Sequence, residues 1–359
     1  MNTVRESDAL HVRVQAFIRA ASDGTERCGD SYESLALAVA RFQAAHVDGY
    51  GRLCKAHGSG EVAATFPAVP TDAFKRARVS AFAQVDTPVA FRTSGTTIGS
   101  RGTHWFRHTH SYNFGALECG ARHLRLSSER FPILIVGPPP AELPDSSLTH
   151  MLSLFVQTWG SVLHDDAFFL RGGVLEIGRL ADLAQSASTP VLVCGTSLAF
   201  VHLLDELGLL QIALPTGSRV MQTGGFKGRS RSVDAANLKD LLAQAFGINM
   251  TDVMSEYGMT ELSTQFYEVA TSDDGFPVYA EPRWARVVPV DPTTLKPVAA
   301  GEEGIARIED LANIDSAWAI VVPDRVRRVS HGFELMGRVP SASPRGCSIA
   351  IDEILGGDL

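Results

Sequence analysis

The sequence predicts an α/β protein of layered architecture that is followed by a β-rich region. Strand-like segments lie at residues 131–137, 191–196 and 218–225, and the first two are almost continuously apolar. Continuous apolar runs are typical of strands that are buried on both faces, as in a parallel sheet. Segments with apolar residues at helical spacing lie between them, so strands and helices alternate up to about residue 250.

The helices are expected where apolar residues recur every three to four positions, at 9–21, 31–46, 109–126, 147–159, 198–209 and 233–246. Asp30 or Ser31 can cap the second of them. The pattern changes after about residue 263, where short β-like runs alternate with turns, at 277–280, 285–290, 304–310, 318–322 and 333–338. We therefore expect an α/β core over 1–262, whose second subdomain begins at about residue 127, a β-rich subdomain over 263–345 and a tail over 346–359.

Composition excludes several functional classes. Hydrophobic residues make up 45% of the 359 residues and charged residues 20%, which is enough to form a sizeable core. The net charge of -8 argues against nucleic-acid binding. Neither a secretory signal nor 18 consecutive apolar residues are present, and we expect no membrane insertion. The five widely spaced cysteines, without a CxxC pair, are typical of a reducing cytoplasm and predict no zinc cluster.

A loop rich in glycine and hydroxyl residues follows the short strand expected at 89–92. Its first five residues carry four hydroxyl groups: Thr93, Ser94, Gly95, Thr96 and Thr97. Hydroxyls and glycine-exposed backbone N–H groups can surround a polyphosphate, and Arg101 adds a fixed positive charge. The loop is not a Walker A motif, because no Gly-Lys-Ser/Thr follows at the required spacing. By itself it fits a phosphate-binding loop and a solvated turn equally well.

A second motif spans 254–262 and joins an aromatic side chain, a glycine, a hydroxyl and an acid. Its central residues are Glu256, Tyr257, Gly258, Met259, Thr260 and Glu261. The tyrosine can stack on a base, and Gly258 permits a tight turn. The Thr260 hydroxyl can bind a phosphate, and the Glu261 carboxylate is a hard oxygen ligand for Mg²⁺.

Together and in this order, the two motifs resemble those of the adenylate-forming superfamily, which includes acyl-CoA synthetases, peptide-synthetase adenylation domains and luciferases. Thr223-Gly224-Gly225 is similar to the glycine pair that borders the adenine in that superfamily. Asp324 stands where the superfamily has a ribose-binding aspartate, and Gly337-Arg338 resembles the pair before its hinge. The resemblance covers roughly residues 65–347.

Within the superfamily the chain looks like the acyl-protein synthetase branch, whose type member supplies fatty acids to the reductase of bacterial bioluminescence. The similar segments are 67–75, 224–227, 257–262 and 345–348. This resemblance implies a large adenylating domain whose β-rich part is a distorted barrel. It also implies ATP and Mg²⁺ as cofactors, a fatty or aromatic carboxylic acid as substrate, and an acyl-adenylate with release of pyrophosphate.

The resemblance also implies a role for each motif. The loop 93–97 would hold the β- and γ-phosphates, Thr260 the α-phosphate and Glu261 the Mg²⁺. The adenine would lie between Tyr257 and the glycine pair, with Glu256, Gly258 and Met259 beside the nucleotide. Asp324 would accept hydrogen bonds from the ribose hydroxyls, and Arg338 would add charge near the ribose or phosphate.

Two departures from the superfamily pattern concern positive charge. The loop lysine is missing, since the sequence reads Ile98-Gly99-Ser100-Arg101 after Thr97. Many members carry a mobile domain with a second lysine after the Gly-Arg hinge, whereas only 21 residues follow Arg338 in this sequence, so we expect no separate mobile C-terminal domain. Either Lys227 or Arg101 would then supply the charge, or a partner would, or adenylation would be slow.

The sequence leaves alternatives open for the acyl acceptor and for the residues that line the acyl pocket. A C-terminal cysteine accepts the acyl group as a thioester in the acyl-protein synthetase branch, and Cys347 is the candidate here, with a small buried hydrophobe as the alternative. The pocket is expected between the strand at 191–196 and the glycine pair, with Phe200, Phe226, Met259 and Trp159 as lining or as ordinary core. His104, His108 and His110 follow the loop, and their context makes metal binding improbable.

Three functions remain open from the sequence. The first is an acid–thiol ligase that transfers the acyl group to Cys347 or to a thiol of a partner. The second is an adenylating enzyme that passes its acyl-adenylate to a separate reductase, coenzyme A or carrier protein. The third is a non-catalytic nucleotide-binding subunit, against which the presence of Thr260, Glu261 and Asp324 argues.

Overall fold

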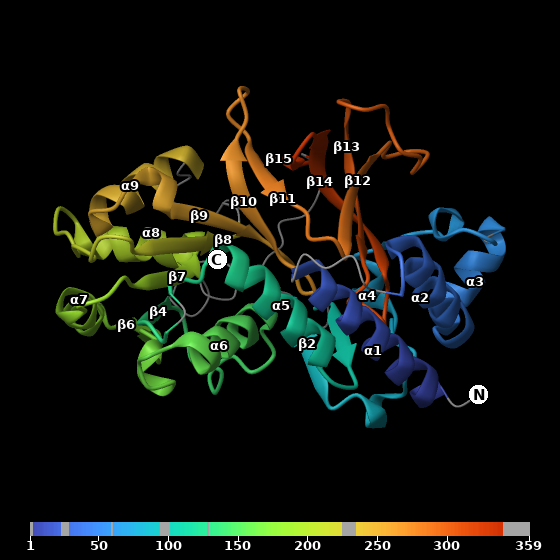
Figure 1. Cartoon of the computed structure of the whole chain (residues 1–359), viewed down its shortest axis with the longest axis horizontal. Coiled ribbons are helices and arrows are strands. Elements are labelled where there is room, and N and C mark those ends of the chain that lie inside the picture. The colour runs from blue at the N-terminus through green and yellow to red at the C-terminus, as the bar shows by residue number, and fades with distance from the viewer. Residues whose placement is uncertain are drawn as a thin grey trace. The chain divides into compact units, whose positions relative to one another are not determined.

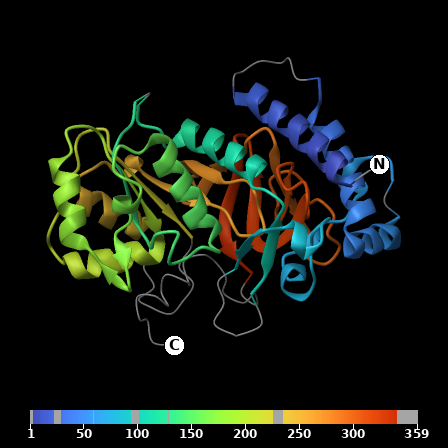
Figure 2. The ribbon, with the colours of Figure 1, turned by 90° about the horizontal axis from the view of Figure 1, so that it is seen from below.

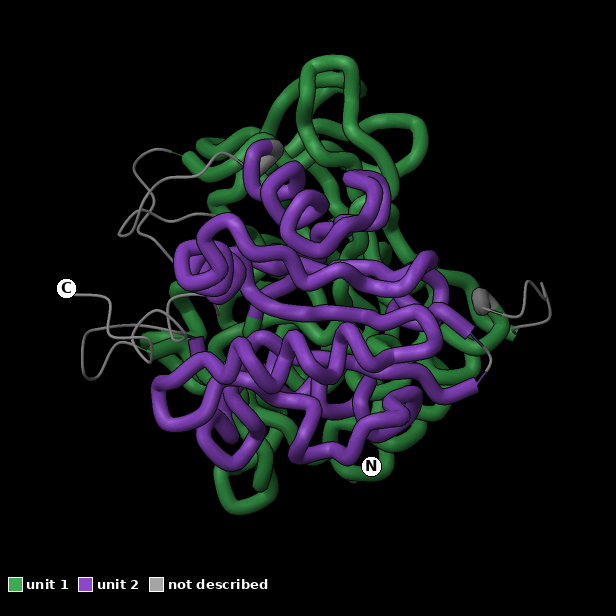
Figure 3. The backbone as a smooth tube through the Cα atoms, turned by 90° about the vertical axis from the view of Figure 1, so that its left-hand side faces the viewer, with its two compact units in different colours: residues 1–92, 97–119, 260–342 green, residues 93–96, 120–259, 343–359 purple. Residues whose placement is uncertain are grey.

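The computed structural model describes residues 3–22, 29–58, 60–93, 101–127, 129–224 and 235–339. The chain divides into two compact units (Figure 3). Unit 1 comprises 1–92, 97–119 and 260–342, and unit 2 comprises 93–96, 120–259 and 343–359. The sequence predicted domains that are continuous along the chain, whereas each compact unit is made of several separate segments. The expected domain boundaries therefore stay a prediction.

Unit 2 contains a parallel sheet with the strand order β9-β8-β7-β4 (Figure 1). These strands are β4 (Ile133–Val136), β7 (Leu192–Thr196), β8 (Arg219–Thr223) and β9 (Val253–Tyr257). All residues of β4 and β7 are buried, which confirms the prediction of strands covered on both faces. A two-stranded hairpin joins β5 (Leu170–Arg171) and β6 (Val174–Leu175).

Four helices pack on this sheet. They are α6 (Ser147–Trp159), α7 (Ile177–Ser186), α8 (Ser197–Leu207) and α9 (Ala235–Phe246). Helix α8 contacts β7 and β8, α9 contacts β9, and α6 contacts β4. The core between these elements includes Leu134, Phe200 and Phe246. The predicted alternation of strands and helices is therefore confirmed.

Unit 1 begins with three successive helices, α1 (Thr3–Ser22), α2 (Tyr32–His46) and α3 (Asp48–His57), drawn in blue in Figure 2. Ser31 caps α2, because its hydroxyl accepts from the Ser34 N–H while the Ser34 hydroxyl accepts from the Ser31 N–H. The unit continues with β1 (Val69–Pro70), α4 (Ala73–Arg76) and the hairpin of β2 (Val89–Arg92) and β3 (Thr103–Phe106). Helix α5 (His110–His123) contains the boundary between the two units.

The β-rich part of unit 1 has the strand order β12-β13-β14-β15-β11-β10. Its strands are β10 (Phe266–Thr271), β11 (Pro277–Ala280), β12 (Ala285–Val290), β13 (Glu303–Asp310), β14 (Ala319–Val329) and β15 (Gly332–Arg338). The predicted β-rich region is confirmed. The barrel that the resemblance implied is not closed among the described strands of this unit, since its pairing path has two ends, β12 and β10.

Short 3₁₀ turns complete the described elements, at Ala63–Thr65, Gln84–Asp86, Asp165–Ala167 and Met250–Asp252. None of the helices within the described ranges is long and apolar enough to cross a membrane.

The hairpin of β14 and β15 depends on a glycine. Gly332 has φ of 142°, and a Cβ atom added there would lie 1.9 Å from the carbonyl oxygen of Tyr279 on the neighbouring β11. We predict that Gly332→Ala lowers the free energy of unfolding by about 2 kcal/mol or more, because strain and a backbone clash combine. Thermal or urea unfolding measures this change.

Gly178→Ala is the matched control, since a Cβ atom there meets nothing within 4 Å and the residue lies in α7. That variant should be neutral or stabilised by up to about 1 kcal/mol. Equal stability of the two alanine variants would contradict the prediction.

Candidate functional site

The structure describes most of the site residues that the sequence nominates. Ser94, Gly95, Thr96, Thr97, Gly225, Lys227 and Cys347 lie outside the described residues, as does Phe226. The motif 256–261 is described throughout, but the boundary between the two units falls between Met259 and Thr260. Its two halves are therefore taken separately.

The half in unit 2 lies at the carboxyl ends of β8 and β9. These strands are parallel, and Thr223 is in register with Glu256. Gly224 follows with φ of 79°, a left-handed conformation that favours glycine. Carboxyl ends of neighbouring parallel strands form the edge at which α/β proteins bind ligands. The structure thus places the first glycine of the pair on the same sheet edge as Glu256 and Tyr257.

Buried hydrogen bonds fix this edge. The Thr223 hydroxyl donates to the Glu256 carboxylate, and the Gln222 amide donates to the Ser255 hydroxyl over 2.7 Å. The Ser197 hydroxyl, at the start of α8, lies 2.5 Å from the Gly224 carbonyl oxygen. Ser197 thus holds the backbone at the turn after β8, and the two side-chain pairs link the ends of β8 and β9.

Glu256 carries an unusual carboxyl group. Burial raises its pKa to about 7, although the hydrogen bond from Thr223 lowers it. A carboxyl group with a pKa near neutrality can carry or release a proton under physiological conditions. Sequence reasoning assigned Glu256 only as a neighbour of the nucleotide, because its burial was not visible in the sequence.

The half in unit 1 contains the hydroxyl and the acid of the motif. Thr260 and Glu261 are only 3% and 4% exposed. The His104 ring lies 2.8 Å from the Thr260 carbonyl oxygen, and the Asn313 amide donates to the Glu261 carbonyl oxygen over 2.8 Å. Both backbone carbonyls of the pair are therefore held by buried side chains.

The residues that follow the pair are held by Asp310. Its carboxylate accepts from the Ser263 N–H over 2.9 Å and from the Thr264 hydroxyl over 2.7 Å. Burial raises the pKa of Asp310 to about 6 despite these hydrogen bonds. Sequence reasoning missed His104 as a contact of the motif, and also Asn313 and Asp310. One signal in the sequence could have indicated these residues: they are polar residues that lie inside otherwise apolar segments, where a buried polar group needs a partner.

Asp324 and Arg338 meet in unit 1 because β14 and β15 are antiparallel and place the two residues in register. The Arg338 Nε atom donates to Asp324 Oδ1 over 2.6 Å, and the carboxylate is buried. The structure thus brings together two nominated residues that are 14 positions apart. Arg101, also in unit 1, is described at the end of the loop, with a guanidinium nitrogen 3.4 Å from the Arg92 carbonyl oxygen.

The candidates for the acyl pocket behave largely as core. Phe200 is fully buried and packs edge-on against Phe246 at a centroid distance of 6.3 Å. Trp159 stacks on Phe155 and is also buried. Met259 is partly exposed and keeps its candidacy. Within the described ranges no group of three His, Cys, Asp or Glu side chains could hold a metal ion.

Comparison with known proteins bears on this arrangement. The family model described as "Acyl-protein synthetase, LuxE" matches residues 184–356. A long-chain-fatty-acid–luciferin-component ligase of Aliivibrio fischeri is 28% identical over 171 residues, which are 44% of this chain and 44% of that protein. The ligase of the same name from Vibrio harveyi is 22% identical over 330 residues, covering 85% and 83% of the two chains. The chain thus spans less than half the length of the first relative and most of the second.

Solved structures confirm the fold. A 2-hydroxyisobutyryl-CoA ligase in its postadenylation state, in complex with an acyl-AMP, has a TM-score of 0.62 at 12% identity, covering 96% of this chain and 70% of that one. A second complex of this ligase gives 0.63 at 13% identity with the same coverage. The family match and the two relatives confirm the resemblance to the acyl-protein synthetases, and the solved structures confirm the fold.

The raised pKa of Glu256 predicts a pH-dependent stability. A carboxyl group whose pKa rises from 4.5 to about 7 on folding destabilises the folded state increasingly as the pH rises between these values. Glu256→Gln removes that cost, so its stability relative to the native chain should be greater at pH 8 than at pH 4.5, by about 3 kcal/mol at most. Thermal unfolding across this pH range measures the difference.

Glu206→Gln, at an exposed position of α8, is the control and should show no such trend with pH. A Glu256→Gln curve that runs parallel to that of the native chain would refute the assigned protonation.

Proposed function

We propose that this chain, a relative of the acyl-protein synthetases, activates a carboxylic acid with ATP and then transfers the acyl group to a thiol. The observation that carries the proposal is the motif 256–261: its residues are ordered, its hydroxyl and acid are buried, and their backbone carbonyls are fixed. The family match and the ligase fold support the same reaction class. The names of the two relatives favour a long-chain fatty acid as substrate, with an aromatic acid as the other class to test.

In the first step a carboxylate oxygen of the acid attacks the α-phosphorus of ATP. The bond from this phosphorus to the oxygen that bridges to the β-phosphate breaks, and pyrophosphate leaves. Such a step needs positioning and charge stabilisation rather than covalent chemistry by the protein. We assign the α-phosphate to the Thr260 hydroxyl, the ribose hydroxyls to Asp324 and the β- and γ-phosphates to the loop 93–97. Arg338 and Arg101 supply positive charge.

Glu261 fits a Mg²⁺ ligand. Its carboxylate is a hard oxygen donor on a backbone fixed by Asn313, and Mg²⁺ at nucleotide sites commonly takes one or two carboxylates plus substrate phosphates. A single carboxylate is therefore compatible with the lack of a three-residue metal group within the described ranges. When bound, Mg²⁺ neutralises phosphate charge.

In the second step a thiolate attacks the acyl carbonyl carbon, and AMP leaves with the bonding electrons. Among the described cysteines, Cys54, Cys119 and Cys194 are buried, and burial raises the pKa of the Cys194 thiol far above its usual range. A buried thiol that resists ionisation is a poor nucleophile. Cys347, outside the described residues, is our proposed acceptor, and a thiol of a reductase-type or carrier-protein partner is the alternative.

The reaction is tested by acid-dependent exchange of labelled pyrophosphate into ATP, with a panel of fatty and aromatic acids. Exchange with at least one acid is expected. Silence across the panel, with nucleotide binding retained, would favour a non-catalytic nucleotide-binding subunit.

We predict that Glu261→Gln lowers the exchange rate about a hundredfold or more, because the charge that holds the Mg²⁺ is lost while the side-chain shape is kept. Glu309→Gln is a matched control, since Glu309 is also a buried glutamate of unit 1 but lies on β13, where it pairs with Arg307. Its exchange rate should stay near that of the native chain. An unchanged rate of pyrophosphate exchange in Glu261→Gln would refute the assignment of Glu261 as the Mg²⁺ ligand.

We predict that the denatured protein retains label from a radioactive acid after incubation with ATP, and that Cys347→Ser abolishes this label without reducing pyrophosphate exchange. Cys28→Ser is the control and should keep the label. Exchange without any label on the protein would instead favour transfer to a partner.

A further inference from the structure

We propose that His104 and Asn313 are positioning residues that hold the Thr260–Glu261 pair for phosphate and Mg²⁺ binding. The proposal rests on the proposed function for the role of the pair, and on the structure of unit 1 for the contacts. Each of the two side chains binds one of two consecutive backbone carbonyls of the motif. Neither belongs to a motif that the sequence nominates.

The His104 ring is held in one orientation and one tautomer. A carbonyl oxygen can only accept, so Nδ1 carries the proton that it donates to Thr260 over 2.8 Å. In the neutral ring Nε2 is then an acceptor, and the Ser316 hydroxyl lies 2.7 Å from it. Burial lowers the pKa of His104 to about 4, which keeps the ring neutral at physiological pH. Phe74 and Phe106 contact the ring, which is 1% exposed.

Asn313 uses its whole amide group. Its nitrogen donates to the carbonyl oxygens of Glu261 over 2.8 Å and Ala317 over 3.1 Å, and its oxygen accepts from the Ser263 hydroxyl. The backbone of Asn313 is held in turn by Gln43 of α2, whose amide donates to its carbonyl oxygen over 2.6 Å. A fully satisfied, buried amide fixes the geometry of every group that it binds.

The position of His104 in the chain gives this contact its functional meaning. His104 lies on β3, which follows the predicted phosphate loop directly, whereas its partner Thr260 lies 156 positions further on. The hydrogen bond therefore attaches β3, the strand that follows the loop 93–97 in the sequence, to the backbone of the motif 256–261. A catalytic group that is displaced by about 1 Å can lose about a hundredfold in rate, so such a link matters more for the rate of the reaction than for binding of the substrate.

His104→Leu removes both hydrogen bonds and keeps an apolar volume. We expect its kcat for pyrophosphate exchange to fall tenfold to a hundredfold, with a smaller change in the KM for ATP. His104→Gln retains an amide donor and should recover part of the lost kcat.

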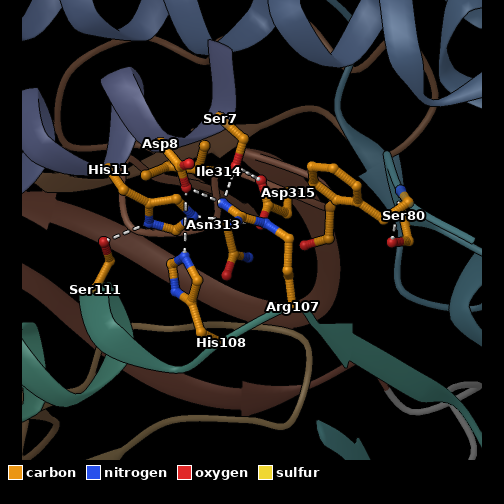
Figure 4. Close-up of polar contacts among 12 residues, drawn as sticks. Ser7, Asp8, His11, Ser80, Arg107, His108, Ser111, Asn313, Ile314 and Asp315 are labelled. Atoms are coloured by element: carbon orange, nitrogen blue, oxygen red, sulfur yellow. Dashed lines mark hydrogen bonds and ion pairs between the residues drawn. The ribbon is translucent and has the colours of Figure 1, made fainter. Parts of the chain in front are cut away.

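His11→Leu is the matched control, because His11 is also a buried histidine of unit 1 with two partners. Its ring lies 2.7 Å from the Ser111 hydroxyl and 3.3 Å from the Asp315 carboxylate (Figure 4). The melting temperature of His11→Leu should fall by about as much as that of His104→Leu, while its kcat stays within about twofold of the native value. If kcat falls in both variants in proportion to the fall in melting temperature, the proposal is overturned.

Hydrogen–deuterium exchange tests the contact without any turnover. Peptides that contain residues 258–264 should exchange faster in His104→Leu than in the native chain, and His11→Leu should leave them unchanged. Ser316→Ala is the milder second variant: it removes one of the two partners that orient the ring, and it should raise exchange in the same peptides.

These measurements separate the two proposals. A native chain without acid-dependent pyrophosphate exchange would refute the proposed function, while faster deuterium exchange of 258–264 in His104→Leu would still support the positioning role. Unchanged deuterium exchange of these peptides in both His104→Leu and Ser316→Ala would overturn the positioning role, even in an active enzyme. If His104→Leu does not fold, Ser316→Ala decides alone.

Discussion

The segment 311–318, which joins β13 to β14, is the constraint on which the described half of the candidate site in unit 1 depends. It lacks regular secondary structure and is almost fully buried, so its polar groups must find partners among side chains. Helix α2 provides Gln43, β3 provides His104, and α1 provides Ser7 and His11, which meet Asp315 near Arg107 (Figure 4). The Thr260–Glu261 pair is held from this segment and from β3. Within the segment, Asn313 binds the pair directly and Ser316 binds it through His104, so a change at either residue should reach the pair.

The pKa values of the buried acids shift in opposite directions, depending on the partners of each carboxyl group. For Asp315, burial by itself would raise the pKa, but the hydrogen bond and charge of His11, together with Ser7 and Arg107, lower it below its usual value. For Asp310 and Glu256, burial outweighs hydrogen bonds from neutral donors, and their pKa values rise. Neutral donors stabilise a carboxylate less than a cation does. Among the described residues, Glu256 and Asp310 accept hydrogen bonds from hydroxyl and backbone N–H groups, whereas Asp315 also has His11 and Arg107 beside it.

Much of the fold followed from local patterns. Apolar strand-like runs at 131–137 and 191–196, with helical spacing between them, predicted β4, β7 and the helices around them, because a strand buried on both faces has no polar side to display. The β-rich region after residue 263 was equally visible as short runs between turns. The distorted barrel that the resemblance implied is not closed among the described strands of unit 1, since closure depends on which strands pair, and pairing is a property of the assembled sheet.

The sequence by itself displayed the order of the motifs, and therefore the resemblance to the superfamily and the nomination of Thr260, Glu261, Asp324 and Arg338. These follow from residue type and spacing, which a chain displays without being folded. Only the tertiary structure decided that Asp324 pairs with Arg338, that Glu256 is buried with a raised pKa, and that His104 holds the Thr260 carbonyl. Each of these facts is a contact or a burial between residues distant in sequence. Hydrogen bonds and desolvation act over a few ångströms, and only folding brings such residues that close.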